Sequence, residues 1–211
     1  MNDTFLLFDL DGTISDPLPG IARSFNYSLS SYGHEELPLS ALAQYIGPPL
    51  DESFRAAIGI ADNDRINDFV GKFRERYADV GYSENTLYPG MGEILNALAK
   101  QSVPMAVCTS KRADFAEKIL KLFGIRQYFA FISGGDVGLK KSQQIESLIA
   151  NGSVDRNNCI MIGDRAIDLS AAHTNGMKSA GVLWGYGSRA ELEAESPARL
   201  LSQPRDLLEL V

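Results

Sequence analysis

A short apolar run that stops at two carboxylates and a glycine limits the possible folds more than any other feature of this sequence. The run is FLLFDLDGT, residues 5–13. Residues 5–9 show no alternation of apolar and polar side chains, which predicts a strand buried on both faces. Strands of this kind belong to parallel sheets, whose ligands bind beyond the carboxyl ends of the strands. We therefore expect Asp9 and Asp11 to lie at a binding site.

Two buried carboxylates in close succession need a partner. Burial and mutual repulsion both oppose the ionisation of Asp9 and Asp11, and a shared proton, a basic side chain or a bound cation is the usual remedy. Acidic oxygens gathered with a backbone carbonyl suit Mg²⁺. Gly12 lets the backbone turn closely past a bound group, although a simple turn after the strand would also explain Asp11 and Gly12.

Further along the chain, apolar runs alternate with segments of helical periodicity. Four more runs predict buried strands, over residues 103–108, 128–133, 159–162 and 179–183. Helices are predicted between them, over residues 91–99, 142–150 and 165–175, together with one that carries Phe115, Ile119, Leu120 and Leu122 and stops at Gly124. Strict alternation of strand and helix is typical of right-handed crossovers, so the sequence predicts an α/β fold with a Rossmann-like, doubly wound parallel sheet.

One part of the chain interrupts this alternation. Helical patterns without an intervening strand cover residues 18–31, 39–43, 51–58 and 64–82. We expect an all-helical cap domain of residues 15–86, inserted into a core domain of residues 1–14 and 87–211. Its position predicts a cap that opens and closes about hinges near residues 13–17 and 86–90. The loop of residues 46–50 either reaches over a site or is a structural turn.

Composition excludes several classes of function. The 211 residues carry a formal charge of −7 and contain no basic cluster long enough to follow a phosphate backbone, so we expect no nucleic-acid partner. No apolar run is long enough to cross a bilayer and no signal segment is visible, so we expect a cytoplasmic protein without a membrane partner. Cys108 and Cys159 fall in predicted strands and are expected to be buried, reduced thiols. For the oligomeric state we expect a monomer or a weak homodimer.

Polar side chains follow three of the predicted strands. They are Asp9 and Asp11 after the first, Thr109, Ser110 and Lys111 after the second, and Asp164 after the fourth. The carboxyl ends of parallel strands meet at one edge of a sheet, so these groups are expected to lie together. A nucleophilic carboxylate, hydroxyl and backbone donors, a lysine and acidic metal ligands would form a phosphate site.

Four motifs, in this order and at these intervals, resemble those of the haloacid dehalogenase-like phosphatases. They are DLDGT at residues 9–13, Thr109-Ser110, a lysine at 140 or 141, and Gly163-Asp164 followed by Asp168. The helical insert and the return at Tyr88-Pro89-Gly90 are similar to the phosphoglycolate phosphatase branch of that family, which has a small helical cap. The resemblance covers nearly the whole chain.

The resemblance implies a role for each acidic residue. Asp9 would attack phosphorus and become an aspartyl phosphate, and Asp11 would protonate the leaving oxygen and later deprotonate the hydrolytic water. Mg²⁺ would be held by Asp9, the backbone carbonyl of Asp11, and Asp164. Asp168 would act through water or orient its neighbours; a carboxylate on the surface of a helix is the less favoured alternative.

The same resemblance assigns the groups that hold the substrate. Thr109 would donate to the phosphoryl group, with the backbone of Ser110 and Gly12 nearby. The lysine departs from the family pattern, because relatives with this cap often have lysine followed by proline, whereas here the order is Lys140-Lys141-Ser142. We prefer Lys141, because Ile145 follows it at the interval of the first core residue of the family's helix. Lys140 would then be exposed.

The implied function is a Mg²⁺-dependent phosphatase acting on a small phosphorylated metabolite. Phosphoglycolate, a sugar phosphate or a nucleoside monophosphate are the expected kinds of substrate. A phosphomutase of the same fold, which returns the phosphoryl group to a sugar, is the main alternative. A non-catalytic phospho-acceptor or binding protein is a third, but an acid/base residue two positions after the nucleophile would have no use there.

Overall fold

The computed structural model describes residues 4–211, and its centre is a six-stranded sheet with the order β5-β4-β1-β6-β7-β8. The strands are β1 (Phe5–Phe8), β4 (Met105–Thr109), β5 (Ile132–Gly134), β6 (Cys159–Gly163), β7 (Lys178–Val182) and β8 (Arg199–Leu201). Every neighbouring pair in this sheet is parallel. The predicted α/β fold with a parallel sheet is therefore confirmed.

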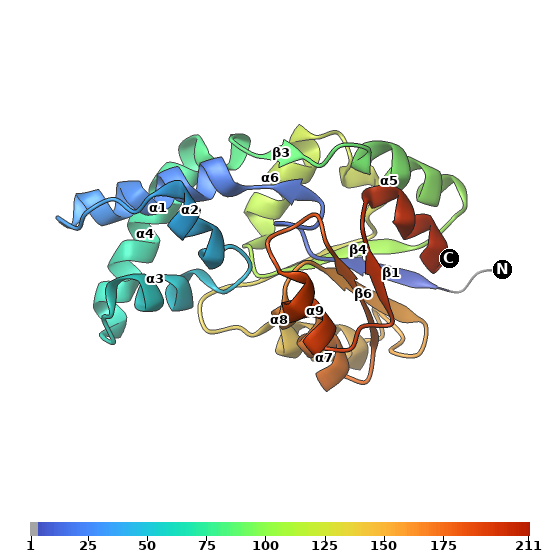
Figure 1. Ribbon diagram of the computed structural model, residues 1–211. Helices are drawn as coiled ribbons and strands as arrows, with labels where there is room; N and C mark the ends of the chain where they lie inside the picture. The colour runs from blue at the N-terminus through green and yellow to red at the C-terminus, as the bar shows by residue number, and fades with distance from the viewer. Residues whose placement is uncertain (1–3) are drawn as a thin grey trace.

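Helices cover both faces of the sheet (Figure 1). On one face lie α5 (Met91–Lys100), α6 (Ala113–Leu122) and the C-terminal 3₁₀ helix η4 (Pro204–Leu210), and on the other α7 (Lys141–Ala150) and α8 (Ala166–Thr174). Successive residues of a strand point to opposite faces, so Leu6 and Phe8 pack into the first layer and Leu7 into the second. This double burial explains why the sequence of β1 is uninterruptedly apolar.

The insert forms a second body of helices beside the carboxyl ends of the strands (Figure 1). It contains α1 (Leu18–Ser31), α2 (Leu39–Leu42), α3 (Leu50–Ile58) and α4 (Asn63–Asp79), with the 3₁₀ helices η1 (Ala43–Tyr45) and η2 (Gly81–Ser83). Its hydrophobic core is largely aromatic; the rings of Phe25 and Phe54, for example, stack 4.0 Å apart. Phe115 of α6 joins this cluster from the core side. The all-helical cap is therefore present.

The two connections between core and cap are hydrogen-bonded to each other. Strand β2 (Ser15–Asp16) pairs with β3 (Thr86–Leu87) in an antiparallel ribbon, and Tyr88 N donates to Ile14 O at 3.2 Å. The expected hinge segments meet in this ribbon, which was not predicted from the sequence. A strand of only two residues is too short to show a periodic pattern of side chains.

Some elements differ from the prediction. The strand expected over residues 128–133 is confined to β5, and Tyr128 instead ends the 3₁₀ helix η3 (Arg126–Tyr128). Phe129, in the apolar run before β5, is buried and extended, and its ring meets that of Phe8 edge-on with the centroids 6.0 Å apart. The edge strand β8 and the short helix α9 (Arg189–Ala194) were not predicted.

Two further expectations concern exposure. Cys108 and Cys159 are both buried, in β4 and β6 respectively. Within residues 4–211, no helix combines the length and the apolar character needed to cross a membrane.

Candidate active site

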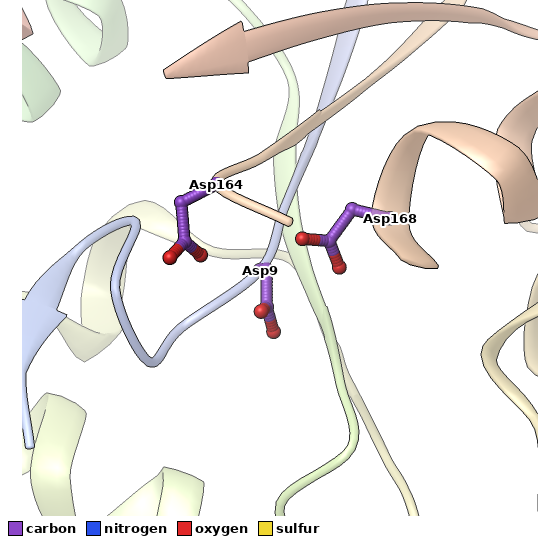
Figure 2. Close-up of side chains that lie close together, drawn as sticks. All are labelled: Asp9, Asp164 and Asp168. Carbon is purple, nitrogen blue, oxygen red and sulfur yellow. The ribbon is translucent and has the colours of Figure 1, made fainter. Parts of the chain in front are cut away.

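Four buried carboxylates gather at the carboxyl edge of the sheet, beneath the cap. Asp9 and Asp11 follow β1, Asp164 follows β6, and Asp168 lies in the first turn of α8. Figure 2 shows the side chains of Asp9, Asp164 and Asp168 around one point, and oxygens of all three lie within 4.8 Å of one another. Asp168 has no exposed surface, so it is not a carboxylate on the outside of its helix.

Lys141 is the cation inside this cluster. It is the first residue of α7, and its Nζ lies 3.0 Å from Asp9 Oδ1 and also bonds Asp168 Oδ1. Burial alone would lower the pKa of Lys141, but the carboxylates of Asp168 and Asp9 outweigh it and hold the pKa above its ordinary value. Ile145, one turn further on the same helix face, is fully buried in the sheet layer, whereas Lys140 is exposed. Lys141 is therefore the lysine that lies in the site.

A second lysine pairs with Asp11. Nζ of Lys111 lies 2.7 Å from Asp11 Oδ2 and donates to the hydroxyl of Tyr77, on α4 of the cap, at 2.8 Å. Burial raises the pKa of Asp11, and Lys111 only partly opposes this. Burial also raises the pKa of Tyr77 to about 12, so its hydroxyl keeps its proton. The cap thus contacts Asp11 through one lysine.

Asp164 is held through both carboxylate oxygens. Oδ1 accepts from Thr13 Oγ1 at 3.2 Å and Oδ2 from Tyr186 N at 2.8 Å. Burial, reinforced by Asp168 and Asp9, raises the pKa of Asp164 well above its usual range. Gly12 lies against the same carboxylate with φ +82°, and a Cβ there would be 2.2 Å from Asp164 Oδ2. Only glycine allows the loop to pass at this point.

Asp168 forms a hydrogen-bonded ion pair with Lys141. Its Oδ1 bonds Lys141 Nζ, and its Oδ2 accepts from the backbone N of Arg165 at 3.1 Å. Burial is the main cause that raises its pKa to about 6; the charge of Asp9 adds to this and Lys141 opposes it. Asp168 therefore orients the lysine and shares the negative charge of the cluster.

Thr109 and Ser110 complete the floor of the site. Thr109 ends β4, and its hydroxyl accepts from Lys111 N at 3.3 Å. Its carbonyl accepts from Gln144 Nε2 at 3.2 Å, which ties α7 to the end of β4. Both residues face the same cavity as Asp9 and Asp11. The structure thus brings together the residues that the sequence singled out after separate strands.

A cavity of about 80 Å³ lies between this floor and the cap. The cap contributes mainly apolar and aromatic walls with one arginine: Ile21, Tyr45, Leu50, Phe73, Arg74 and Tyr77. Gly47 and Pro48 line it too, so the loop of residues 46–50 does reach over the site. Arg165, next to Asp164, donates from Nη1 to Ile46 O at 2.6 Å and fixes this loop to the core.

The donor set fits a divalent cation. Four buried carboxylates face only two ammonium groups, those of Lys111 and Lys141, which leaves an excess of two negative charges if all are ionised. Oδ1 of Asp9 is close to Lys141, yet neither it nor Oδ1 of Asp11 receives a well-aligned hydrogen bond within the described residues. Buried acidic oxygens without donors suit a hard ion that prefers oxygen ligands, such as Mg²⁺.

Two contributors to this site, Tyr77 of the cap and Tyr186, were not predicted from the sequence. Lys111 was expected among the groups at this edge of the sheet, but without a role of its own. Tyr186 follows β7, so the rule that polar groups after parallel strands meet at one edge would have found it. Nothing in the sequence marks Tyr77, because its position in α4 is also that of an ordinary core residue.

Comparisons with known proteins place this geometry in a family. Residues 6–182 match the haloacid dehalogenase-like hydrolase family. A 5'-nucleotidase from Pseudomonas aeruginosa is 37% identical over 91% of this chain and 88% of that protein. A phosphoglycolate phosphatase from Pectobacterium atrosepticum is 32% identical over 98% and 91%. The solved structure of the protein tyrosine kinase PtkA from Mycobacterium tuberculosis superposes with a TM-score of 0.81 at 30% identity, covering 98% of this chain and 96% of that one.

The fold, the order of the four motifs and these similarities agree. The family match extends from β1 to the end of β7 and so includes the strands that carry Asp9, Thr109 and Asp164. The chain belongs to the haloacid dehalogenase-like hydrolase family.

Proposed function

We propose that this protein is a Mg²⁺-dependent phosphatase that hydrolyses a small phosphate monoester through an aspartyl-phosphate intermediate. The observation that supports it best is the placement of Asp9, a buried carboxylate with Lys141 at 3.0 Å on one side and a second acid, Asp11, two residues along the chain. A nucleophile, a cation for the phosphoryl oxygens and an acid/base group are what acyl-phosphate chemistry requires.

The proposed mechanism gives each residue of the site a separate role. Asp9 attacks phosphorus while Lys141 balances the charge of the nucleophile and of the phosphoryl oxygens. Thr109, with the backbone of Ser110 and Gly12, orients the phosphoryl group. Asp11 gives its proton to the leaving oxygen, and the burial that raises its pKa favours the protonated form that this step needs.

The metal would be held at the same edge of the sheet. Asp9, the backbone carbonyl of Asp11, and Asp164 are the proposed ligands, and Asp168 orients Lys141 beside them. When bound, Mg²⁺ supplies positive charge that offsets the phosphoryl oxygens. We further propose that the cap extends over residues 15–86 and closes over the site to exclude water, since its aromatic walls face the cavity.

The relatives suggest which esters to test. A 5'-nucleotidase and a phosphoglycolate phosphatase, both similar over most of their length, favour a nucleoside 5'-monophosphate or phosphoglycolate. The likeness to PtkA raises a second possibility, transfer of the phosphoryl group to a tyrosine hydroxyl instead of to water. A phosphomutase would transfer it back to a sugar.

A panel of esters separates these reactions. Nucleoside 5'-monophosphates, phosphoglycolate and hexose phosphates are incubated with the protein and Mg²⁺, and free phosphate is measured. We expect release of phosphate without a bisphosphate activator, and its loss when Mg²⁺ is chelated. Transfer of the phosphoryl group to a sugar or to an added tyrosine-containing peptide, with no release of free phosphate, would contradict hydrolysis and favour the corresponding transfer reaction.

Mg²⁺ is also expected to stabilise the fold without any substrate. A ligand that binds only the native state at about 100 times its Kd adds roughly 2.7 kcal/mol to the free energy of unfolding. Thermal unfolding with Mg²⁺ and with chelator should therefore show a clear rise in Tm, and Asp164→Asn should remove most of the rise. Glu146→Gln, at an exposed position of α7, is the matched control and should keep it. An equal rise in Asp164→Asn would remove Asp164 from the ligand set.

A further inference from the structure

The residues just after β7 connect the cap hinge to the acidic cluster, and the proposed mechanism does not use them. Trp184 donates from Nε1 to Thr13 O at 2.9 Å. Two residues later, Tyr186 N donates to Asp164 Oδ2 at 2.8 Å, and the Tyr186 hydroxyl bonds Asp16 Oδ1. This segment, residues 184–186, thus contacts both the connection to the cap and a carboxylate of the site.

The hydrogen bonds around Asp164 form a closed ring. One carboxylate oxygen accepts from the side chain of Thr13 and the other from the backbone of Tyr186, and Thr13 is itself bonded through its carbonyl to Trp184. The packing inside the ring is tight, since a Cβ on Gly185 would lie 2.3 Å from both Asp164 Cβ and Gly12 O. A shift of the hinge residues must therefore be accompanied by a shift at Asp164.

Asp16 extends this network of hydrogen bonds into the cap. Its Oδ1 accepts from Leu18 N, the first residue of α1, at 3.0 Å, in addition to the Tyr186 hydroxyl. The ring of Tyr186 packs against the hydrophobic cluster of the cap. Burial and the hydrogen bond to Asp16 raise the pKa of Tyr186, so its hydroxyl remains a donor. Tyr186 therefore contacts the cap and strand β2 with its side chain, and Asp164 with its backbone N–H.

We propose that Tyr186 is a positioning residue that couples closure of the cap to the placement of Asp164. The inference rests on the proposed function in one respect, the role of Asp164 as a ligand of Mg²⁺. Motion of the cap about the β2–β3 ribbon displaces Asp16, and the hydroxyl of Tyr186 transmits the displacement to the backbone N–H that holds Asp164. Coupling between sites is reciprocal, so Mg²⁺ at Asp164 stabilises the closed cap to the same extent that closure tightens Mg²⁺ binding.

Tyr186→Phe tests the proposal by removing only the hydroxyl. Trp184 is the only tryptophan and contacts the hinge, so its emission reports a titration with Mg²⁺ alone. We expect about tenfold weaker Mg²⁺ binding in the variant, the effect of losing one hydrogen bond to a charged group. We also expect faster hydrogen exchange at the amides of Leu18 and Tyr88, which are protected by Asp16 and by the ribbon.

The matched control is Tyr27→Phe. It removes a hydrogen bond of the same kind, from a tyrosine hydroxyl to Glu75 Oε1 at 2.7 Å, but within the cap. It should change neither the Mg²⁺ affinity nor the exchange of the two amides. Asp16→Asn is the second variant. For the Mg²⁺ affinity it should add little to Tyr186→Phe, because both weaken the hydrogen bond between the Tyr186 hydroxyl and Asp16.

Two outcomes would overturn the coupling. One is Mg²⁺ affinity and amide exchange in Tyr186→Phe equal to those of the wild type. The other is a lower Tm with unchanged Mg²⁺ affinity, which would give Tyr186 a purely structural role. Absence of phosphate release by the wild type would overturn the proposed function instead, and the Mg²⁺ titration and the exchange measurements do not depend on that result.

Discussion

Asp9→Asn is expected to lower the rate of phosphate release by about 10⁴-fold or more, the scale seen when a covalent nucleophile is removed. The amide has nearly the shape of the carboxylate but cannot form the acyl phosphate. The fold should tolerate it, because the charge of Asp9 raises the pKa values of Asp11, Asp164 and Asp168 and so works against their ionisation. In chelator, the variant should unfold at least as late as the wild type.

The measurement pairs steady-state phosphate release with thermal unfolding on the same preparations. Asp68→Asn, at an exposed position of α4, serves as the control and should leave both values unchanged. Full activity in Asp9→Asn would remove Asp9 from the mechanism. Loss of activity together with loss of the fold would show that the carboxylate is needed for the structure rather than for the chemistry.

Lys141→Met is expected to abolish phosphate release and also to destabilise the protein by about 3–5 kcal/mol, the cost of leaving buried charges without their partner. Asp9 and Asp168 both face this ammonium group and form no other ion pair within residues 4–211. The neighbouring Lys140→Met is the matched control. Lys140 is exposed, so its replacement should change the stability by no more than about 0.5 kcal/mol.

Urea unfolding and phosphate release distinguish the two lysines directly. A larger effect on either property from Lys140→Met than from Lys141→Met would contradict the assignment of the catalytic lysine to Lys141. Added Mg²⁺ should recover part of the lost stability of Lys141→Met, since the cation also compensates the acidic cluster, but it should not recover activity.

The sheet and the acidic residues of the site were predictable because their sequence patterns extend over whole strands. Residues buried on both faces of a parallel sheet give apolar runs such as that of β1, and polar groups after each run meet at one edge. Lys141 was distinguishable from Lys140 by the spacing to Ile145, which the structure buries in the layer below. These inferences rest on periodicity and topology, which act over the whole element.

The features that were missed depend on single contacts. Strand β8 has three residues, of which only Leu201 is buried, so it has no pattern to detect. The aromatic residues before β5 favour a strand locally, and Phe129 is indeed extended, but Tyr128 ends the 3₁₀ helix η3 and the strand begins only at Ile132. The contacts of Lys111 with Tyr77 and of Tyr186 with Asp16 join residues far apart in the chain, and only the assembled structure reveals them.

The β2–β3 ribbon brings the two ends of the insert together. Asp16 and Thr86, close to the two ends of the insert, are direct partners across the ribbon, so the chain leaves and re-enters the core at almost the same place. Antiparallel partners lie about 5 Å apart, which a tight turn can bridge. We therefore expect that the insert can be exchanged: a shorter loop or a different lid joined at this point should leave the strand order and the register of the sheet unchanged.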